Sequence, residues 1–204
     1  MKVALLNYGM GNLTSATMAL EHVGAEVELT SDYAKVRAAD AVVLPGVGAF
    51  PKAMEAVRRL GLDELMHERR DAGVPILGIC LGMQLLFDGS EELGGAEGLG
   101  LLRGNVKALQ VDGLKVPQIG WNSVRWRPGS RLASGTTAMY HVHSFAAHPT
   151  DPSVIAGTAT YGEDFVSAVE DGNVFGVQFH PEKSSRDGLS LLREFVHSAA
   201  RTPA

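Results

Sequence analysis

The one cysteine of this chain, Cys80, lies between two glycines in a G-x-C-x-G pattern. Residues 75–87 are typical of a buried strand, a sharp turn and a helix, the cysteine counterpart of a nucleophile elbow. The nucleophile of an elbow takes a crowded backbone conformation, so Gly78 and Gly82 must lack side chains. The helix that follows points its free N–H groups at the sulfur, which favours the thiolate, and the N–H of Leu81 is placed to stabilise an oxyanion. The spacing predicts a nucleophilic cysteine.

A base for this cysteine is available far downstream, where an apolar strand ends in His180 and Glu182 follows two residues later. His180 can relay a proton between the sulfur and a leaving group, while Glu182 fixes its tautomer and supports the imidazolium. Pro181 has a fixed φ and would hold the two side chains in a set relation. The order Cys, then His-x-Glu, differs from the orders of papain-like proteases and caspases.

The elements that must position these residues alternate between short apolar strands and amphipathic helices in the first half of the chain. This alternation predicts a parallel, doubly wound sheet with sites at the carboxyl ends of its strands. The expected strands are 2–7, 26–30, 41–44 and 74–79, and the expected helices are 14–23, 49–60, 63–72 and 81–87.

The second half has a different character. Residues 89–104 carry six glycines and three glutamates, which predicts a loop. We expect strands after it, several of them antiparallel, and a closing helix with a periodic apolar face. The expected strands are 106–111, 123–126, 139–145, 154–160, 165–170 and 173–179, and the helix is 187–198.

Composition narrows the class of protein. The chain has 204 residues, of which 45% are hydrophobic and 20% charged, as in a globular protein with a full core. The net charge of −5, without a basic run, argues against a nucleic-acid partner. No stretch approaches transmembrane length, so no membrane association is expected. The single cysteine excludes an internal disulfide and fits a reducing cytoplasm. We expect a single domain, residues 1–204, in the cytoplasm.

Three motifs, in the order that they have along the chain, resemble those of the class I, triad-type glutamine amidotransferases. They are the elbow extended to Gln84, the terminal His-Pro-Glu, and the Leu-Pro-Gly-Val-Gly of residues 44–48, which looks like that family's oxyanion loop. The resemblance implies a flavodoxin-like α/β fold with a mostly parallel central sheet plus antiparallel additions. It also implies glutamine hydrolysis without a metal or organic cofactor. The implied roles are the triad Cys80, His180 and Glu182; the oxyanion hole Val47, Gly48 and Leu81; and glutamine binding by Gly48, Gln84, Ser144 and Phe145.

Accessory motifs resemble, essentially end to end, the glutaminase subunits of imidazole glycerol phosphate synthase. These motifs lie at residues 7–13, 90–92, 120–122, 140–144 and 180–184, with minor departures at Gln118 and His141. A glutaminase domain alone takes up a chain of this length. The site that binds the acceptor of the ammonia must therefore lie on a separate chain. The resemblance implies a heterodimer in which ammonia passes to a cyclase subunit. It places Asn12, Trp121, Tyr140 and Lys183 at the interface with that subunit.

Other interpretations of the same residues stay open. The chain could be a glutaminase for pyridoxal phosphate or an aromatic amino acid pathway, a cysteine peptidase, a γ-glutamyl hydrolase, or a non-catalytic regulatory module. The intact triad and both elbow glycines argue against the last. Gly9 and Gly11 could form a phosphate-binding turn, but Thr14 breaks the G-x-G-x-x-G spacing. His141 and His143 could be a metal pair, but no third ligand is evident, so structural histidines are favoured.

Overall fold

The computed structural model describes residues 1–199 of the chain, and its centre is one continuous sheet. Five parallel neighbours form the first part, in the spatial order β2-β1-β3-β4-β13. The order 2-1-3-4 followed by one further strand is that of flavodoxin-like sheets. These strands are β1 (Lys2–Leu6), β2 (Glu26–Thr30), β3 (Ala41–Leu44), β4 (Ile76–Ile79) and β13 (Val174–Val177).

Mostly antiparallel strands extend this sheet in two directions, although β5 pairs with β7 in parallel. From β13 the order continues through β12, β10, β7, β5 and β6, while β11, β8 and β9 branch from β12. The expected α/β class, a parallel sheet with antiparallel additions, is confirmed. The added strands are β5 (Gly89–Ser90), β6 (Ala96–Glu97), β7 (Gly104–Ala108), β8 (Gln118–Trp126), β9 (Thr136–His143), β10 (Phe145–Pro149), β11 (Ile155–Tyr161) and β12 (Glu163–Asp171).

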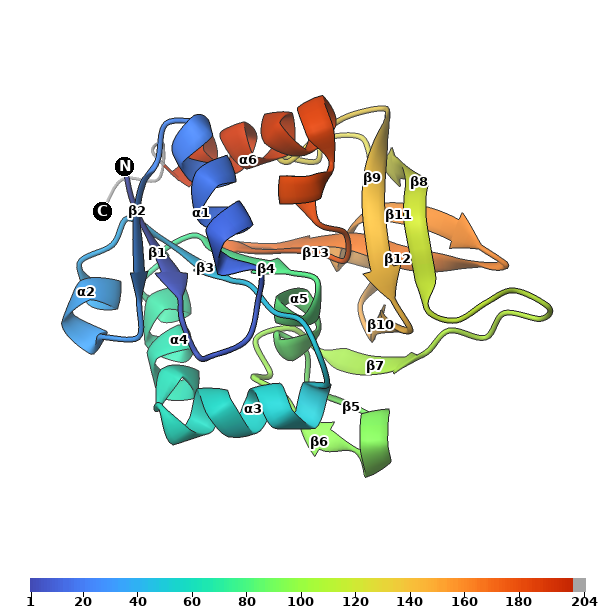
Figure 1. Cartoon of the computed structure of the whole chain (residues 1–204), viewed down its shortest axis with the longest axis horizontal. Helices are drawn as coiled ribbons and strands as arrows, with labels where there is room; N and C mark the ends of the chain where they lie inside the picture. The colour runs from blue at the N-terminus through green and yellow to red at the C-terminus, as the bar shows by residue number, and fades with distance from the viewer. Residues whose placement is uncertain (200–204) are drawn as a thin grey trace.

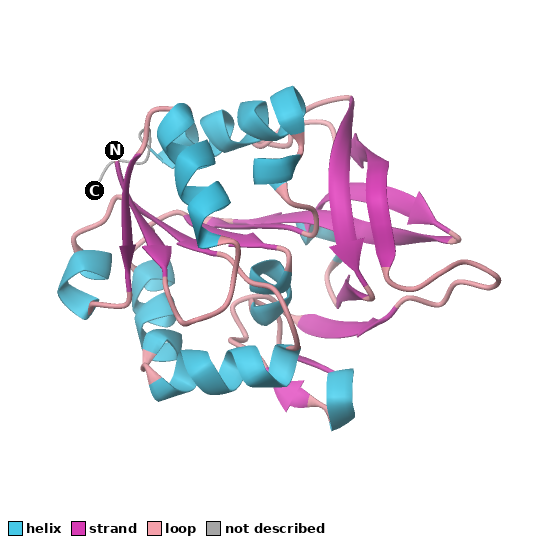
Figure 2. Ribbon diagram, viewed as in Figure 1, coloured by secondary structure: helices cyan, strands magenta, loops and turns pink. Residues whose placement is uncertain are grey.

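Helices cover both faces of the parallel part (Figure 1). One face carries α1 (Leu13–His22) and α6 (Ser185–Ala199), and the other carries α3 (Phe50–Arg59) and α4 (Leu62–Asp71). The short α5 (Leu81–Leu85) follows β4, and α2 (Tyr33–Arg37) lies beside the edge strand β2. Figure 2 shows that the helices gather around the parallel strands, whereas the other half of the molecule is built almost entirely of strands. No helix within residues 1–199 is long and apolar enough to cross a membrane.

The apolar strands of the parallel part fill two cores, one on each face. In β1, Val3 and Leu5 join the core under α1 and α6, while Ala4 and Leu6 join the core under α3 and α4. Successive side chains of a strand point to opposite faces, so a strand covered on both sides must be apolar throughout. All four side chains are fully buried. The continuous apolar runs that predicted strands therefore also specify the three-layer arrangement.

Three expectations need correction. Residues 89–104 are not a plain loop, because β5 and β6 pair as a small hairpin that adds to β7. The expected strand 139–145 is two strands, β9 and β10, and β10 pairs with β7 and β12. Helix α2 was not expected, although Asp32 caps it by accepting a hydrogen bond from the Lys35 N–H at 3.0 Å. Elements of two to five residues owe their form to tertiary pairing and capping, so periodicity does not reveal them.

Candidate active site

The elbow around Cys80 has the strained geometry that its glycines predict. Cys80 lies between the end of β4 and the start of α5, with φ 55° and ψ −112°. A positive φ is costly for a residue with a side chain and is tolerated only where the surroundings impose it. A Cβ on Gly78 would lie 2.7 Å from the backbone of Met83, and one on Gly82 would lie 1.8 Å from the Leu44 carbonyl oxygen. Close packing therefore requires both glycines.

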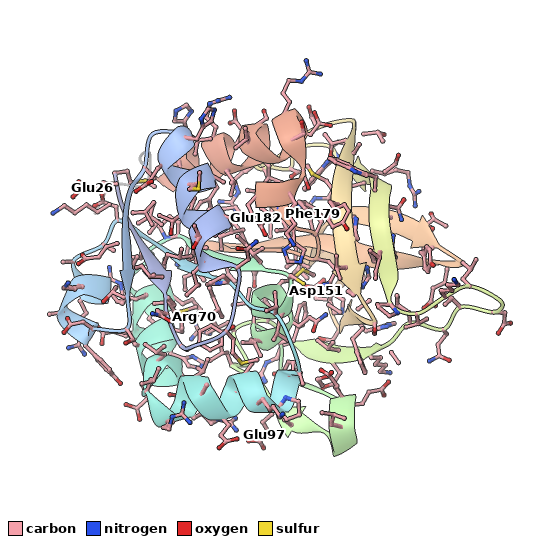
Figure 3. The ribbon with its side chains drawn as sticks, in the orientation of Figure 1. Glu26, Arg70, Glu97, Asp151, Phe179 and Glu182 are labelled. Carbon is pink, nitrogen blue, oxygen red and sulfur yellow. The ribbon has the colours of Figure 1, made fainter. Side chains whose placement is uncertain are left out.

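His180 and Glu182 follow β13 and reach the same end of the sheet as Cys80. His180 Nδ1 and Glu182 Oε1 are 2.8 Å apart, and the two side chains are only 5% and 3% exposed. Figure 3 shows Glu182 beside the lower end of α1. The Ser184 hydroxyl donates to the His180 carbonyl at 2.6 Å and accepts from the Tyr140 N–H at 2.9 Å. The histidine is thus held through its ring and its backbone. No local pattern in the sequence indicates this role of Ser184.

The charge state of His180 follows from its neighbours. Burial alone would lower the pKa of His180, but hydrogen bonds to Cys80 and Glu182, together with their negative charges, outweigh burial and raise the pKa to about 9. The imidazole therefore carries a proton at neutral pH and can give it to a leaving group beside the sulfur of Cys80.

A cavity of about 300 Å³ opens in front of Cys80 and His180. Its volume suits a small polar molecule. Every residue predicted for the oxyanion hole or for glutamine binding lines it, as does the predicted interface residue Lys183. The predicted residues in its wall are Val47, Gly48, Leu81, Gln84, Ser144 and Phe145.

Glu92 also lines this cavity, although the sequence analysis assigned it no role beyond its accessory motif. It lies in a turn (Glu92–Gly94) within the hairpin of β5 and β6, and its Oε2 accepts a hydrogen bond from the Phe50 N–H at 2.8 Å. That N–H begins α3, where a negative charge is favoured. The carboxylate is therefore fixed at the cavity wall by a helix N-terminus.

The loop of residues 45–48 is pinned at one end and open at the other. The Tyr8 hydroxyl donates to the Pro45 carbonyl at 2.6 Å, and burial, followed by the charge on Cys80, raises the pKa of Tyr8. A Cβ on Gly46 would lie 2.5 Å from that hydroxyl oxygen. Gly48, in contrast, has φ +99°, and Val47 is 41% exposed. Tyr8 was missed by the sequence analysis because no local pattern relates it to Pro45.

The four residues predicted for a partner interface border the site. Trp121 on β8 is 56% exposed, and its ring packs edge-on against Tyr140 of β9 with centroids 6.0 Å apart. Lys183 lines the cavity, and Asn12 lines a small neighbouring space together with His180 and Glu182. Further exposed apolar side chains precede or lie on β8. They are Leu114, Val116 and Ile119.

His141 and His143 are buried and fully hydrogen-bonded. His141 contacts the Met139 carbonyl and the Ser167 hydroxyl at 3.1 and 2.9 Å, and His143 contacts the Phe145 carbonyl and the Gln118 side chain at 2.9 and 3.0 Å. Burial, aided by repulsion from His143, lowers the pKa of His141 to about 3, and burial lowers that of His143 to about 4. Within residues 1–199 no group of three His, Cys, Asp or Glu side chains is arranged to hold a metal ion.

Comparison with known proteins gives the class to which this fold and site belong. The family model described as glutamine amidotransferase class-I matches residues 4–199, so the chain belongs to that family. A solved structure titled "Structure of PurLQS from Thermotoga maritima" has a similar fold, with a TM-score of 0.77 and 20% identity, covering 97% of this chain and 98% of that one. The glutaminase domain of Trypanosoma brucei CTPS is similar too, with a TM-score of 0.71 and 18% identity, covering 100% and 95%.

Curated relatives narrow the assignment within this class. The imidazole glycerol phosphate synthase subunit HisH of Moorella thermoacetica is 50% identical over 196 residues, covering 95% of this chain and 93% of that protein. The subunit of the same name from Aquifex aeolicus is 45% identical over 205 residues, covering 98% and 99%. The chain is thus a member of the HisH subunit family, which confirms the resemblance found in the sequence.

Proposed function

We propose that this chain is the glutaminase subunit of an imidazole glycerol phosphate synthase, which hydrolyses glutamine to glutamate and ammonia for histidine biosynthesis. The observation that carries the proposal is the buried array of Cys80, His180 and Glu182 facing a cavity of about 300 Å³. The membership of this chain in the class I glutamine amidotransferase family supports the same function. No metal or organic cofactor enters the proposed chemistry, and the single cysteine supports a cytoplasmic location.

In the proposed mechanism the Cys80 thiolate attacks the side-chain amide carbon of glutamine. The N–H groups of Leu81 and of the Val47–Gly48 loop hold the developing oxyanion. His180, already protonated at neutral pH, gives its proton to the departing ammonia and then accepts one from the water that hydrolyses the thioester. Glu182 keeps the imidazole in the tautomer and orientation that this relay needs.

The cavity offers groups for each end of the substrate. In this proposal Gly48, Gln84, Ser144 and Phe145 position the glutamine, as the family resemblance implies. Glu92 adds a fixed carboxylate at the wall of the cavity, a suitable partner for the α-ammonium group of an amino acid. This anchoring would place the side-chain amide against Cys80.

We further propose that the ammonia passes to a cyclase subunit in a heterodimer, where it is used to form imidazole glycerol phosphate and AICAR from PRFAR. Ammonia released into water at neutral pH is mostly protonated and no longer nucleophilic, so direct transfer favours a complex. The exposed side chains of Ile119 and Trp121 on β8 support a partner docked there. The proposed contacts are Asn12, Trp121, Tyr140 and Lys183.

The partner would also switch the enzyme on. Gly48 has a left-handed φ of +99°, and the neighbouring Val47 is exposed, so the peptide between them has room to turn. With its carbonyl toward the sulfur this peptide repels an oxyanion, and with its N–H there it stabilises one. Losing one such donor costs about 10²–10³ in rate, so the turn alone gates the reaction. Docking of a ligand-bound cyclase would favour the active orientation.

The test is to combine the chain with the cyclase subunit and follow both half-reactions. Cys80→Ala should abolish glutamate release and glutamine-dependent synthesis, but leave synthesis from ammonium salts intact because the acceptor site is on the other chain. His22→Gln, at an exposed position of α1, is the matched control and should retain both activities. Glutamine turnover by Cys80→Ala would refute the proposed function.

A further inference from the structure

Gln178 is a fully buried amide that none of the roles above uses. It lies between β13 and His180, where its backbone N–H donates to the Ser167 carbonyl at 2.9 Å. Its side-chain Nε2 is 3.8 Å from Cys80 Sγ, and its Oε1 accepts from Gln84 Nε2 at 3.0 Å. One side chain therefore contacts both the nucleophile and a side chain of the glutamine pocket.

The orientation of this amide follows from a backbone carbonyl. The Phe145 carbonyl oxygen can only accept, and it is 3.1 Å from the Gln84 amide, so the amide must present its NH₂ group there. The second hydrogen of that NH₂ points to the Gln178 side chain. Gln178 must therefore present its oxygen there as the acceptor. The NH₂ of Gln178 is then the group that faces the sulfur. The reverse orientation would oppose two NH₂ groups and point an oxygen at the thiolate.

Within residues 1–199, few other side chains can donate to a charged sulfur. The thiol of Cys80 donates to the Val142 carbonyl at 3.8 Å, and that carbonyl becomes a repulsive neighbour once the proton has left. His180 is one remaining donor, and the Tyr8 hydroxyl is committed to Pro45. The other titratable side chains at the cavity wall are Glu92, His143 and Lys183.

We propose that Gln178 is a positioning residue for the glutaminase reaction: its amide N–H holds the Cys80 thiolate, and its oxygen ties that thiolate to the glutamine pocket through Gln84. The inference rests on the proposed function for the identity of the nucleophile. It adds a mechanical link between substrate binding and the reacting atom, because a shift of Gln84 on binding glutamine moves the donor that orients the Gln178 amide.

Two substitutions separate the two contacts. Gln178→Met has a similar length and no hydrogen-bonding amide, so it removes both contacts with little change in packing. Gln178→Glu retains an oxygen that accepts from Gln84 and removes the amide donor to the sulfur. Gln118→Met is the matched control, because Gln118 is a buried amide that contacts His143 and not the sulfur.

Alkylation of the isolated chain measures the contact with sulfur. Since Cys80 is the only cysteine, incorporation of iodoacetamide reports on it alone. A hydrogen bond to a charged group corresponds to roughly ten- to a hundredfold in an equilibrium, and the 3.8 Å separation favours the lower end. Gln178→Met should therefore alkylate about tenfold more slowly at pH 6, with its rate–pH midpoint moved upward. Gln118→Met should retain the wild-type profile. An unchanged midpoint in Gln178→Met overturns the proposal.

Steady-state kinetics of the complex measure the contact with the pocket. Gln178→Met should raise KM for glutamine and lower kcat, whereas Gln178→Glu should lower kcat with KM close to that of the wild type. An equal rise of KM in both variants would show that Gln84 is not held this way. Thermal unfolding checks that each variant folds; should Gln178→Met fail, Gln178→Asn withdraws the amide from the sulfur and must move the alkylation midpoint in the same direction. Cys80→Ala tests the proposed function separately.

Discussion

The buried histidines His141 and His143 make the stability of this protein sensitive to mild acid. In the folded state their pKa values are lowered from 6.5 to about 3 and about 4. Between pH 6.5 and pH 4 the unfolded chain therefore binds two protons that the folded chain does not, and the free energy of unfolding falls as the pH falls. Each group contributes about 1.4 kcal/mol per pH unit in this window. Between pH 7 and pH 5 the pair removes about 4 kcal/mol, a large part of a typical total of about 5–15 kcal/mol.

Urea unfolding at pH 7, 6 and 5, followed by tryptophan fluorescence, measures this slope. His141→Gln removes one titrating group, so it should lower stability at pH 7 yet flatten the decline by about 1.4 kcal/mol per pH unit below pH 6. His22→Gln, at an exposed position, is the control and should decline as the wild type does. The reasoning is wrong if His141→Gln declines as steeply as the control. His180 acts in the opposite sense: its pKa is raised to about 9, so its contribution is complete below pH 6.5 and is lost as the pH rises toward 9.

Further predictions concern the reaction. Glu182→Gln should reduce glutamine turnover less than His180→Ala does, because Glu182 orients the base; the reverse order of kcat values would contradict this role. Cys80→Ala/Glu182→Gln should be no worse than Cys80→Ala, since residues that act as a unit are non-additive. Tyr8→Phe leaves the Pro45 carbonyl without its partner, so we expect a loss of about 1–3 kcal/mol in urea unfolding and slower turnover, whereas unchanged values would show that Tyr8 does not pin the loop. The free chain should hydrolyse glutamine very slowly and gain orders of magnitude with cyclase and acceptor. Lys183→Ala should blunt that gain without changing alkylation of Cys80; a free chain at its full complexed rate would refute the gating.

The sequence predicted those parts of the structure that local patterns encode. Strands 26–30 and 41–44 were predicted with the bounds they have. Residues 41–44 form the uninterrupted apolar run of a strand covered on both faces, and residues 26–30 alternate between polar and apolar side chains as an edge strand does. The elbow was predicted for a similar reason, since its strain requires glycines at fixed spacing from Cys80. The hairpin of β5 and β6 and the separate strand β10 were not, because their pairing with β7 decides their conformation.

The candidate site also has parts that local patterns predicted and parts that they did not. Motifs predicted the residues that line the cavity, but not the contacts that hold them. Gln178 and Cys80 are separated by 98 positions, and Tyr8 and Pro45 by 37, so no local pattern relates either pair. Ser184 was likewise visible only as part of a motif. Its bridge between His180 and the β9 backbone depends on how the sheet branches.

That bridge also covers an edge of the sheet. Among the described residues, strand β9 pairs with β8 alone, so its other side would present open backbone groups to neighbouring molecules. The segment after β13 occupies that side: the His180 N–H donates to the Tyr140 carbonyl, Ser184 accepts from the Tyr140 N–H, and Asp187 accepts from the Ala138 N–H at 3.1 Å. The residues that arrange the base thus also cover a sheet edge. Substitutions at Ser184 or Asp187 will therefore uncover a surface competent for intermolecular strand pairing, and their solubility must be measured beside their kinetics.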